Sequence, residues 1–235
     1  MSSPSDQLSE RELKFALPRE REAVVSAWLS ALCEPDSAHP ENEVVSVYFD
    51  TPELAALSEK LDGDDRKTKV RLRWYEDPRG ARPSSPVFLE IKGRSGGTRF
   101  KVHTELGFEV AEILAQPLDR RMPPAFTAAL AQHGVASPER LLPVVELRYS
   151  RSRFVEPWSG TRMALDRAIH AARSHPRLLP RATTPHLPFA VLEAKGTGRE
   201  LPERLRQLLA LGCRPAAISK YALVLAALGG PGEDL

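Results

Sequence analysis

The sequence has 235 residues, of which 42% are hydrophobic, so it can bury the core of one large domain or two small ones. Its 33 Lys and Arg residues nearly balance its 31 Asp and Glu residues, and a net charge of +2 argues against a general nucleic-acid-binding surface. Met1–Ser9 lacks the apolar core of a signal peptide, and the longest apolar run, Tyr221–Leu228, is too short to span a bilayer. We therefore expect a cytoplasmic protein with no membrane insertion and no nucleic-acid partner, and its two cysteines suit a reducing compartment.

Short runs of alternating polar and apolar residues predict about eight β-strands. In chain order these strands are Arg11–Leu17, Glu43–Phe49, Thr68–Tyr75, Val87–Gly93, Thr98–Leu106, Pro143–Phe154, Thr161–Ile169 and Pro188–Ala194. Apolar residues at helical spacing predict helices at Pro18–Cys33, Pro52–Leu61, Val110–Gln116, Pro123–His133, Glu200–Leu211 and Pro215–Leu228. We expect an α+β fold: an eight-stranded antiparallel β-barrel with helices packed on its outside. Residues 1–235 would form a single domain with its core at about 8–228.

Strand after strand carries one charged face and one apolar face. In the third predicted strand, for example, Lys69, Arg71 and Arg73 share one face, while Val70 and Leu72 share the other. Such a sheet either exposes its charged side to solvent or, where helices cover the apolar side, turns the charges into a barrel. The abundance of arginine favours the barrel, because buried cations need a counter-charge and a guanidinium group suits phosphate oxygens. We therefore predict that the barrel holds a triphosphate or polyphosphate.

The glutamates on these strands need a separate reason, because carboxylates repel phosphates. Glu10, Glu12 and Glu193 are suited to bind Mg²⁺ or Mn²⁺ through hard oxygen atoms, and the ion would then bridge them to phosphate oxygens. The alternative is that each glutamate pairs with a neighbouring Lys or Arg.

A series of motifs occurs in order along nearly the whole chain. Glu10-x-Glu12-x-Lys14 is followed by Tyr48–Thr51, Lys69–Tyr75, Leu89–Lys92, Arg148–Phe154, Arg162–Ile169, Leu192–Lys195 and Ser219–Lys220. This set resembles the VTC domain, the polyphosphate polymerase catalytic module of the CYTH, or triphosphate tunnel metalloenzyme, superfamily. The resemblance implies a tunnel of antiparallel strands that binds a linear phosphate chain.

The resemblance also implies a set of phosphate contacts, namely Lys14, Arg71, Arg73, Lys92, Tyr149, Arg151, Arg162 and Lys220. It implies that Glu193 is a metal ligand. Their place in the same strands and motifs adds further phosphate-binding candidates, namely Lys69, Arg99, Lys101, Lys195 and Ser219. We expect Arg71, Arg73, Arg151, Arg162 and Glu193 to be the catalytic set, in which the arginines stabilise the phosphate oxygens and Glu193 holds the metal.

The expected activity is metal-dependent phosphoryl transfer by a polyphosphate polymerase that uses the terminal phosphate of ATP. Two alternatives remain open at this point. One is a tripolyphosphatase or organic triphosphatase, since Ala216–Ile218 stand where the polymerase would offer a basic neighbour to Ser219–Lys220. The other is a non-catalytic polyphosphate sensor.

Overall fold

The computed structural model describes residues 11–61, 67–81, 84–95, 98–107, 109–120, 122–198 and 200–231. Its strands are β1 Arg11–Pro18, β2 Glu34–Pro35, β3 Glu41–Asp50, β4 Lys67–Glu76, β5 Val87–Ser95, β6 Thr98–Leu106, β7 Leu142–Val155, β8 Arg162–Ser174, β9 Phe189–Gly196 and β10 Arg214–Pro215. Its α-helices are α1 Glu22–Leu32, α2 Ala55–Leu61, α3 Val110–Leu114, α4 Pro124–Gln132, α5 Gln207–Ala210 and α6 Lys220–Ala227. Short 3-10 helices lie at Arg19–Arg21, Pro138–Arg140 and Glu203–Leu205.

The chain divides into two compact units. Unit 1 comprises Met1–Asn42, Ser150–Ala168 and Pro188–Ile218, and unit 2 comprises Glu43–Tyr149, Ile169–Leu187 and Ser219–Leu235. Strands β3, β7 and β8 contribute residues to both units. The single domain over residues 1–235 stays a prediction, and each unit is described by itself below.

All eight predicted strands are present, and the residue pairs between them are antiparallel. The predicted closed barrel of eight strands, however, is corrected to an open sheet. In the described residues this sheet has ten strands in the order β10-β1-β9-β8-β7-β3-β4-β5-β6, with β2 paired to β7. The two additional strands, β2 and β10, have only two residues each, too few for an alternating pattern to reveal them. Pro215 at the β10 end has no backbone N–H that could donate to a further strand.

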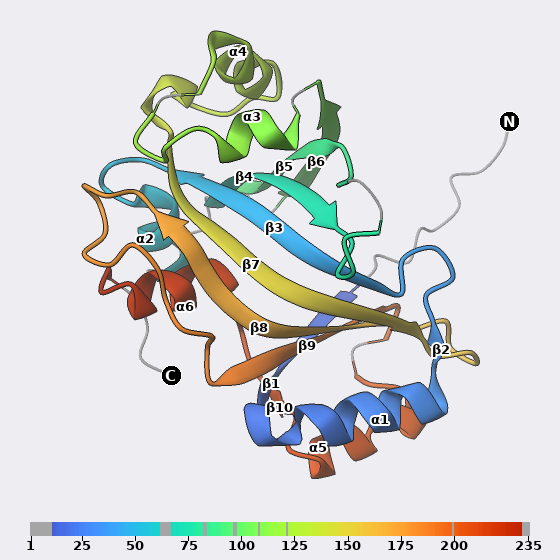
Figure 1. Cartoon of the computed structure of the whole chain (residues 1–235). Helices are drawn as coiled ribbons and strands as arrows, with labels where there is room; N and C mark the ends of the chain where they lie inside the picture. Colours follow the sequence, from blue (N-terminus) through green and yellow to red (C-terminus); the bar gives the residue numbers. More distant parts are fainter. Residues whose placement is uncertain are drawn as a thin grey trace, which may run out of the picture. The chain divides into compact units, whose positions relative to one another are not determined.

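The core of unit 1 forms between strands and helices. The apolar face of β1 supplies Phe15 and Leu17, and β9 supplies Leu192, all of which are buried with Val25 and Leu29 of α1. Leu205, which ends the 3-10 helix before α5, and Leu208 of α5 also belong to this cluster, and Figure 1 shows α1 and α5 side by side below β1. The predicted cover of helices over an apolar strand face is therefore confirmed for this unit.

Both cysteines lie in the unit 1 core. Cys33 follows α1, and Cys213 lies between α5 and β10. Both thiols are free, and burial raises the pKa of each to about 11, with a further contribution from the Glu156 carboxylate at Cys33.

Unit 2 has a core of the same kind. Val47 of β3, Leu72 and Trp74 of β4 and Leu89 of β5 lie on the apolar face of the sheet and are at most 1% exposed. Helices α3 and α4 pack on this face, and Phe49 contacts Phe126 with 4.8 Å between the ring centroids. The opposite face of the same strands is thereby left to the charged residues.

Helix boundaries were predicted less well than strands. Pro18, predicted to begin a helix, ends β1, and α1 begins at Glu22 after one 3-10 turn. The helix predicted from Pro215 begins at Lys220, because Arg214–Pro215 forms β10. None of the helices in the described ranges combines the length and the apolar character needed to cross a membrane.

Candidate functional site

In unit 2, strand register brings the charged side chains into rows. Tyr48 of β3 lies opposite Arg71 of β4, which lies opposite Glu90 of β5, which in turn lies opposite His103 of β6. These residues share one face of the sheet, because equivalent positions of neighbouring antiparallel strands project to the same side.

Arg71 is the centre of this row. Its Nε donates to Glu90 Oε2 at 2.7 Å, its Nη2 donates to the same oxygen, and its Nη1 donates to Tyr48 Oη at 2.7 Å. Burial alone would raise the pKa of Glu90, but the charges of Arg71 and Arg73 outweigh it and hold that pKa well below its usual range. Burial likewise disfavours the Arg71 cation, yet its partners Tyr48 and Glu90 keep its pKa above the ordinary value. Arg71 is therefore a fixed cation with its planar group held in place.

Arg73 lies two residues after Arg71 on the same face of β4 and is 5% exposed. Its Nε donates to Ser46 Oγ at 3.0 Å and its Nη2 to Tyr149 Oη at 3.2 Å, while its Nη1 lies 3.8 Å from Glu90 Oε2. The Lys220 ammonium lies 5.3 Å from the centre of the Tyr149 ring. One glutamate thus faces two guanidinium groups, of which that of Arg73 is buried and that of Arg71 is half-buried.

A row of lysines runs beside the arginines. Lys69 of β4 lies opposite Lys92 of β5, and Lys92 lies opposite Lys101 of β6. Like charges directly opposite one another destabilise a sheet, so this row favours the binding of an anion. The Lys69 ammonium also donates to Ser219 Oγ at 3.2 Å, and Ser219 caps α6 by accepting from the Ala222 N–H.

Tyr48 connects Arg71 to the start of α6. Its ring stacks on Tyr221 with 5.1 Å between the centroids, and the Tyr221 hydroxyl donates to Asp50 Oδ2 at 2.8 Å. Burial opposes ionisation of Tyr48, but Arg71 and Arg73 reverse this effect and lower its pKa to about 8. Asp50 is fully buried, and this burial raises its pKa although backbone N–H groups donate to it.

Unit 1 carries a second charged cluster. Glu12 of β1 lies opposite Lys195 of β9, and Lys14 lies opposite Glu193. The Lys14 ammonium lies 3.4 Å from Glu12 Oε1 and 3.8 Å from Glu193 Oε1, and it donates to the carbonyl oxygen of Ile218 at 3.4 Å. Two of the predicted metal-binding carboxylates therefore converge on one ammonium group.

Arg151 of β7 joins the same cluster. Its Nε donates to Asp166 Oδ1 at 2.5 Å, and its Nη2 donates to Asp166 Oδ2 at 2.7 Å and to Glu193 Oε2 at 3.2 Å. Asp166 is fully buried and Glu193 is 6% exposed, so this guanidinium group is held as firmly as that of Arg71.

The remaining predicted residues lie at the edges of these clusters or outside the description. Arg162 is exposed at the start of β8, opposite Lys195. Glu10 lies outside the described residues, and so does the side chain of Arg99, whose backbone belongs to β6. Each of the other predicted residues thus belongs to the cluster of its own unit.

The carboxylates of unit 1 are chemically suitable ligands for a divalent metal ion. In the described part of the chain, no group of three or more His, Cys, Asp or Glu residues could hold an ion. Mg²⁺, however, commonly binds to proteins through one or two carboxylates together with phosphate oxygens and water, and carboxylates are hard ligands. Glu12 and Glu193 meet that requirement as a pair.

Sequence reasoning missed Tyr48, Ser46 and Asp166 as partners of the arginines. Tyr48 and Ser46 lie on the same face of β3, so alternation alone could have placed them beside β4 once that pairing was known. Asp166 lies within the Arg162–Ile169 motif, but its contact is with Arg151 on β7, which the order of the motifs does not indicate.

Comparison with known proteins adds family evidence. A family model described as the VTC domain matches residues 9–228. None of the curated proteins matches the sequence. A solved structure named "putative adenylate cyclase" from Bacillus halodurans has a TM-score of 0.54 at 14% identity, covering 89% of this chain and 93% of its own. Another with the same description, from Vibrio parahaemolyticus, has a TM-score of 0.49 at 13% identity, covering 93% of this chain and 98% of its own. At such identities the likeness to the first structure concerns the fold alone.

Proposed function

Because the chain belongs to the VTC domain family, within the triphosphate tunnel superfamily, we propose that it is an enzyme that transfers a phosphoryl group along a linear phosphate chain. The observation that carries this proposal is the pair of guanidinium groups of Arg71, half-buried, and Arg73, buried, which face one carboxylate. The lysine row Lys69, Lys92 and Lys101 beside them supplies further positive charge. A linear polyphosphate provides the repeated negative charge that such a surface binds.

The arginines act through their fixed positions. Phosphoryl transfer depends on positioning and charge stabilisation more than on covalent chemistry by the protein. Hydrogen bonds to Glu90 and Tyr48 hold the Arg71 guanidinium group in place before any ligand binds. Tyr149 and Ser46 hold the Arg73 guanidinium group in the same way. Donors held in this way stabilise the charge on equatorial phosphate oxygens without reorganising during the reaction.

Unit 1 contributes a matching set. Arg151, held by Asp166, offers its guanidinium group to phosphate, and Lys14 contributes an ammonium. Glu193, together with Glu12, would hold Mn²⁺ or Mg²⁺. The bound ion would neutralise charge on the phosphate chain. Lys195 and Arg162 would add positive charge within unit 1, and Lys220 would do so within unit 2.

Synthesis of polyphosphate from ATP is the preferred direction. In this reaction the oxygen of a terminal acceptor phosphate forms a bond to the γ-phosphorus, the β–γ bridging bond breaks, and ADP leaves with the electron pair. The acceptor is already anionic near neutral pH, so no general base is needed. Hydrolysis would need a group to take a proton from water, and Glu90 is a poor base because two arginines lower its pKa.

One incubation distinguishes the candidate functions. The protein is mixed with ATP and Mn²⁺, and the products are separated by size. Long polyphosphate supports the polymerase, and free phosphate alone supports a triphosphatase. Retained polyphosphate binding without either product supports a sensor and refutes the enzyme.

The residue assignments have their own test. Arg71→Ala should abolish most turnover and weaken tripolyphosphate binding, while Arg79→Ala, in an exposed turn of the same unit, should change neither. Glu193→Ala should abolish turnover and weaken the binding of Mn²⁺, and the exposed Glu139→Ala serves as its control. Turnover undiminished by Glu193→Ala would refute the metal assignment.

A further inference from the structure

His103 of β6 stands at the end of the charged row of unit 2 and has no role in the proposed function. Its Nδ1 lies 3.4 Å from Glu90 Oε1. Arg71 donates to the other oxygen of the same carboxylate, Oε2, and Arg73 Nη1 lies 3.8 Å from Oε2. His103 and the two arginines therefore contact different oxygens of one carboxylate.

A stacking contact holds the His103 ring beside Glu90. The ring lies nearly parallel to that of Phe88, with 4.6 Å between the centroids and 16° between the planes. Phe88 lies on the same face of β5 as Glu90, because the two residues are separated by one position. The His103 side chain is nevertheless 44% exposed, so protons and a ligand can reach it from solvent.

Charged groups of both signs face His103. Lys101 and Glu105 flank it on the same face of β6, and Lys92 of β5 lies diagonally opposite, since it pairs with Lys101. The carboxylates of Glu90 and Glu105 attract a protonated ring, whereas the two ammonium groups repel it. Imidazole is the side chain that ordinarily changes its charge between pH 5 and 8. The row can therefore gain or lose one positive charge in this range.

We infer that His103 is a positioning residue for the arginine site, because its protonated ring pairs with Glu90 Oε1 and reduces the negative charge that a phosphate ligand meets beside Arg71. With a neutral ring, the charge on Oε1 repels the ligand more strongly. A phosphate chain should therefore bind more tightly when His103 is protonated. This inference rests on the proposed function, since it assigns a pH dependence to the same binding site.

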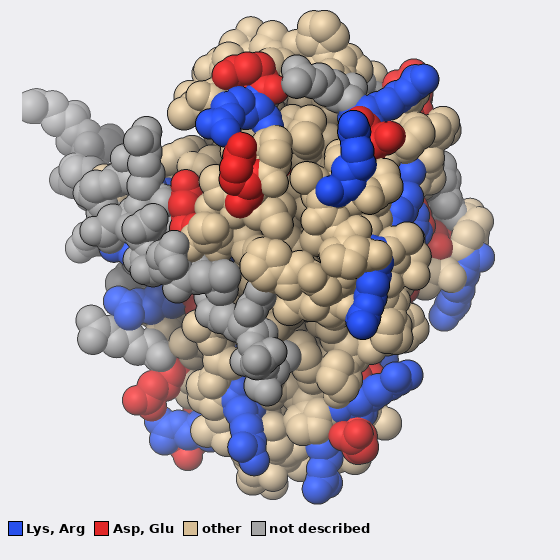
Figure 2. All heavy atoms as spheres, turned by 90° about the vertical axis from the view of Figure 1, so that its left-hand side faces the viewer, with Lys and Arg blue, Asp and Glu red and all other residues tan. Residues whose placement is uncertain are grey.

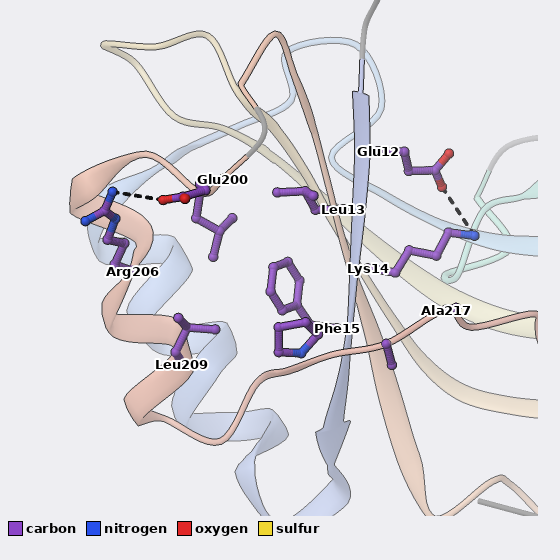
Figure 3. A pocket seen from close by; sticks show the side chains of 11 residues that line it. Glu12, Leu13, Lys14, Phe15, Glu200, Arg206, Leu209 and Ala217 are labelled. Atoms are coloured by element: carbon purple, nitrogen blue, oxygen red, sulfur yellow. Dashed lines mark hydrogen bonds and ion pairs between the residues drawn. The ribbon is translucent and has the colours of Figure 1, made fainter.

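The charged cluster of unit 1 is built from different groups. Figure 3 shows its Lys14 paired with Glu12, and the ammonium lies 3.4 Å from Glu12 Oε1. Its other members described above are carboxylates and a guanidinium group. Groups of these kinds ordinarily keep their charge between pH 5 and 8. We therefore expect the pH dependence in this range to come from unit 2.

Two variants of His103 separate its charge from its packing. His103→Gln removes the charge and keeps a polar side chain. His103→Arg carries a permanent charge on a planar group that can still stack on Phe88. The matched control is His133→Gln, because His133 follows α4, which packs on the apolar face of the same sheet.

The experiment measures the dissociation constant of tripolyphosphate with Mg²⁺ by calorimetry at pH 6 and pH 8. At pH 6, His103→Gln should bind about fivefold more weakly than wild type, the upper range for a partly exposed charge, and at pH 8 the two should be equal. His103→Arg should match wild type at pH 6 and bind about fivefold more tightly than wild type at pH 8. His133→Gln should match wild type at both values. Protonation of the ligand affects every protein alike and cancels in these ratios.

The possible failures are distinct. If wild-type protein binds tripolyphosphate but its advantage over His103→Gln is the same at both pH values, His103 acts only through packing, and the inference is wrong while the proposed function stands. No gain in affinity for His103→Arg at pH 8 would overturn the inference in the same way. If wild-type protein binds tripolyphosphate at neither pH, the proposed function is wrong and the inference falls with it.

Discussion

Replacing Glu90 by glutamine should reveal how strongly the arginines of unit 2 depend on a counter-charge. The Glu90 and Arg73 side chains are each 7% exposed, and that of Arg71 is 17% exposed. Removing one partner of a buried ion pair costs about 3–5 kcal/mol, since the remaining charge stays buried. Glutamine keeps one acceptor oxygen for Arg71, so we expect a loss near the lower end, about 3 kcal/mol.

A phosphate ligand should restore this stability. With Glu90→Gln, both guanidinium groups lack their carboxylate, so tripolyphosphate should bind more tightly than to the wild type. Ligand at 100 times its dissociation constant stabilises a folded protein by about 2.7 kcal/mol. Urea denaturation with and without tripolyphosphate, followed by circular dichroism, measures both effects. Glu53→Gln is the control, because Glu53 and Arg140 form an exposed pair at 2.9 Å that should matter little.

The pH dependence gives the same prediction a second test. The pKa of Glu90 is lower in the folded protein than its ordinary value, so its stabilising contribution is present above that value and is lost as the pH falls through the folded-state pKa. The difference in free energy of unfolding between wild type and Glu90→Gln should therefore shrink on acidification. A variant that is as stable as wild type, with unchanged affinity for tripolyphosphate, would refute the counter-charge argument.

Three further predictions concern neighbouring groups. Burial opposes ionisation of Tyr48, yet the arginines lower its pKa to about 8. Above that pH the Tyr48 phenolate should compete with the ligand for Arg71 and weaken tripolyphosphate binding. Tyr48→Phe should remove this pH dependence in a binding titration. Tyr221→Phe removes the donor to Asp50 and should cost about 1–3 kcal/mol in urea denaturation, whereas no loss would show that the buried carboxylate needs only its backbone donors. Arg173→Met removes a guanidinium group that donates to three carbonyl oxygens at the end of α3, so hydrogen exchange of α3 should accelerate, and unchanged exchange would contradict this capping role.

Strand alternation predicted the faces of the sheet because it depends only on local geometry. Lys69, Arg71 and Arg73 share the polar face of β4 as predicted, and Leu72 and Trp74 are buried on the other. The alternation of residues along one strand does not determine which residues of a distant strand lie beside it. The contact of Arg151 with Asp166, and the open order of the sheet, depend on such long-range pairing and were therefore missed.

Asp50 illustrates the same limit at a single residue. It lies directly before Thr51 and Pro52, a position typical of a helix cap, and its Oδ1 accepts from the Ala56 N–H at 2.8 Å. Its other oxygen accepts from Tyr221, which lies 171 residues further along the chain. The hydrogen bonds that Asp50 accepts from Thr51, Ala56 and Leu57 are local, whereas the one from Tyr221 depends on where α6 packs.

The surface mixes charges of both signs, as the composition predicts. Figure 2 shows Lys and Arg side chains interspersed with Asp and Glu on the face in view. The excess of positive charge around Arg71 and the lysine row of unit 2 is therefore a property of particular strand faces, and the net charge of +2 does not reveal it.

The two buried cysteines have a practical consequence for measurement. Since the pKa of each thiol is about 11, both are almost entirely protonated at neutral pH and, being buried, are poor nucleophiles. A cysteine introduced at an exposed position would then react selectively with a maleimide dye in the native protein. Single-site fluorescent labels could therefore be attached to either unit without first removing Cys33 or Cys213 from the core, which would allow the distance between labelled positions to be followed while nucleotide is added.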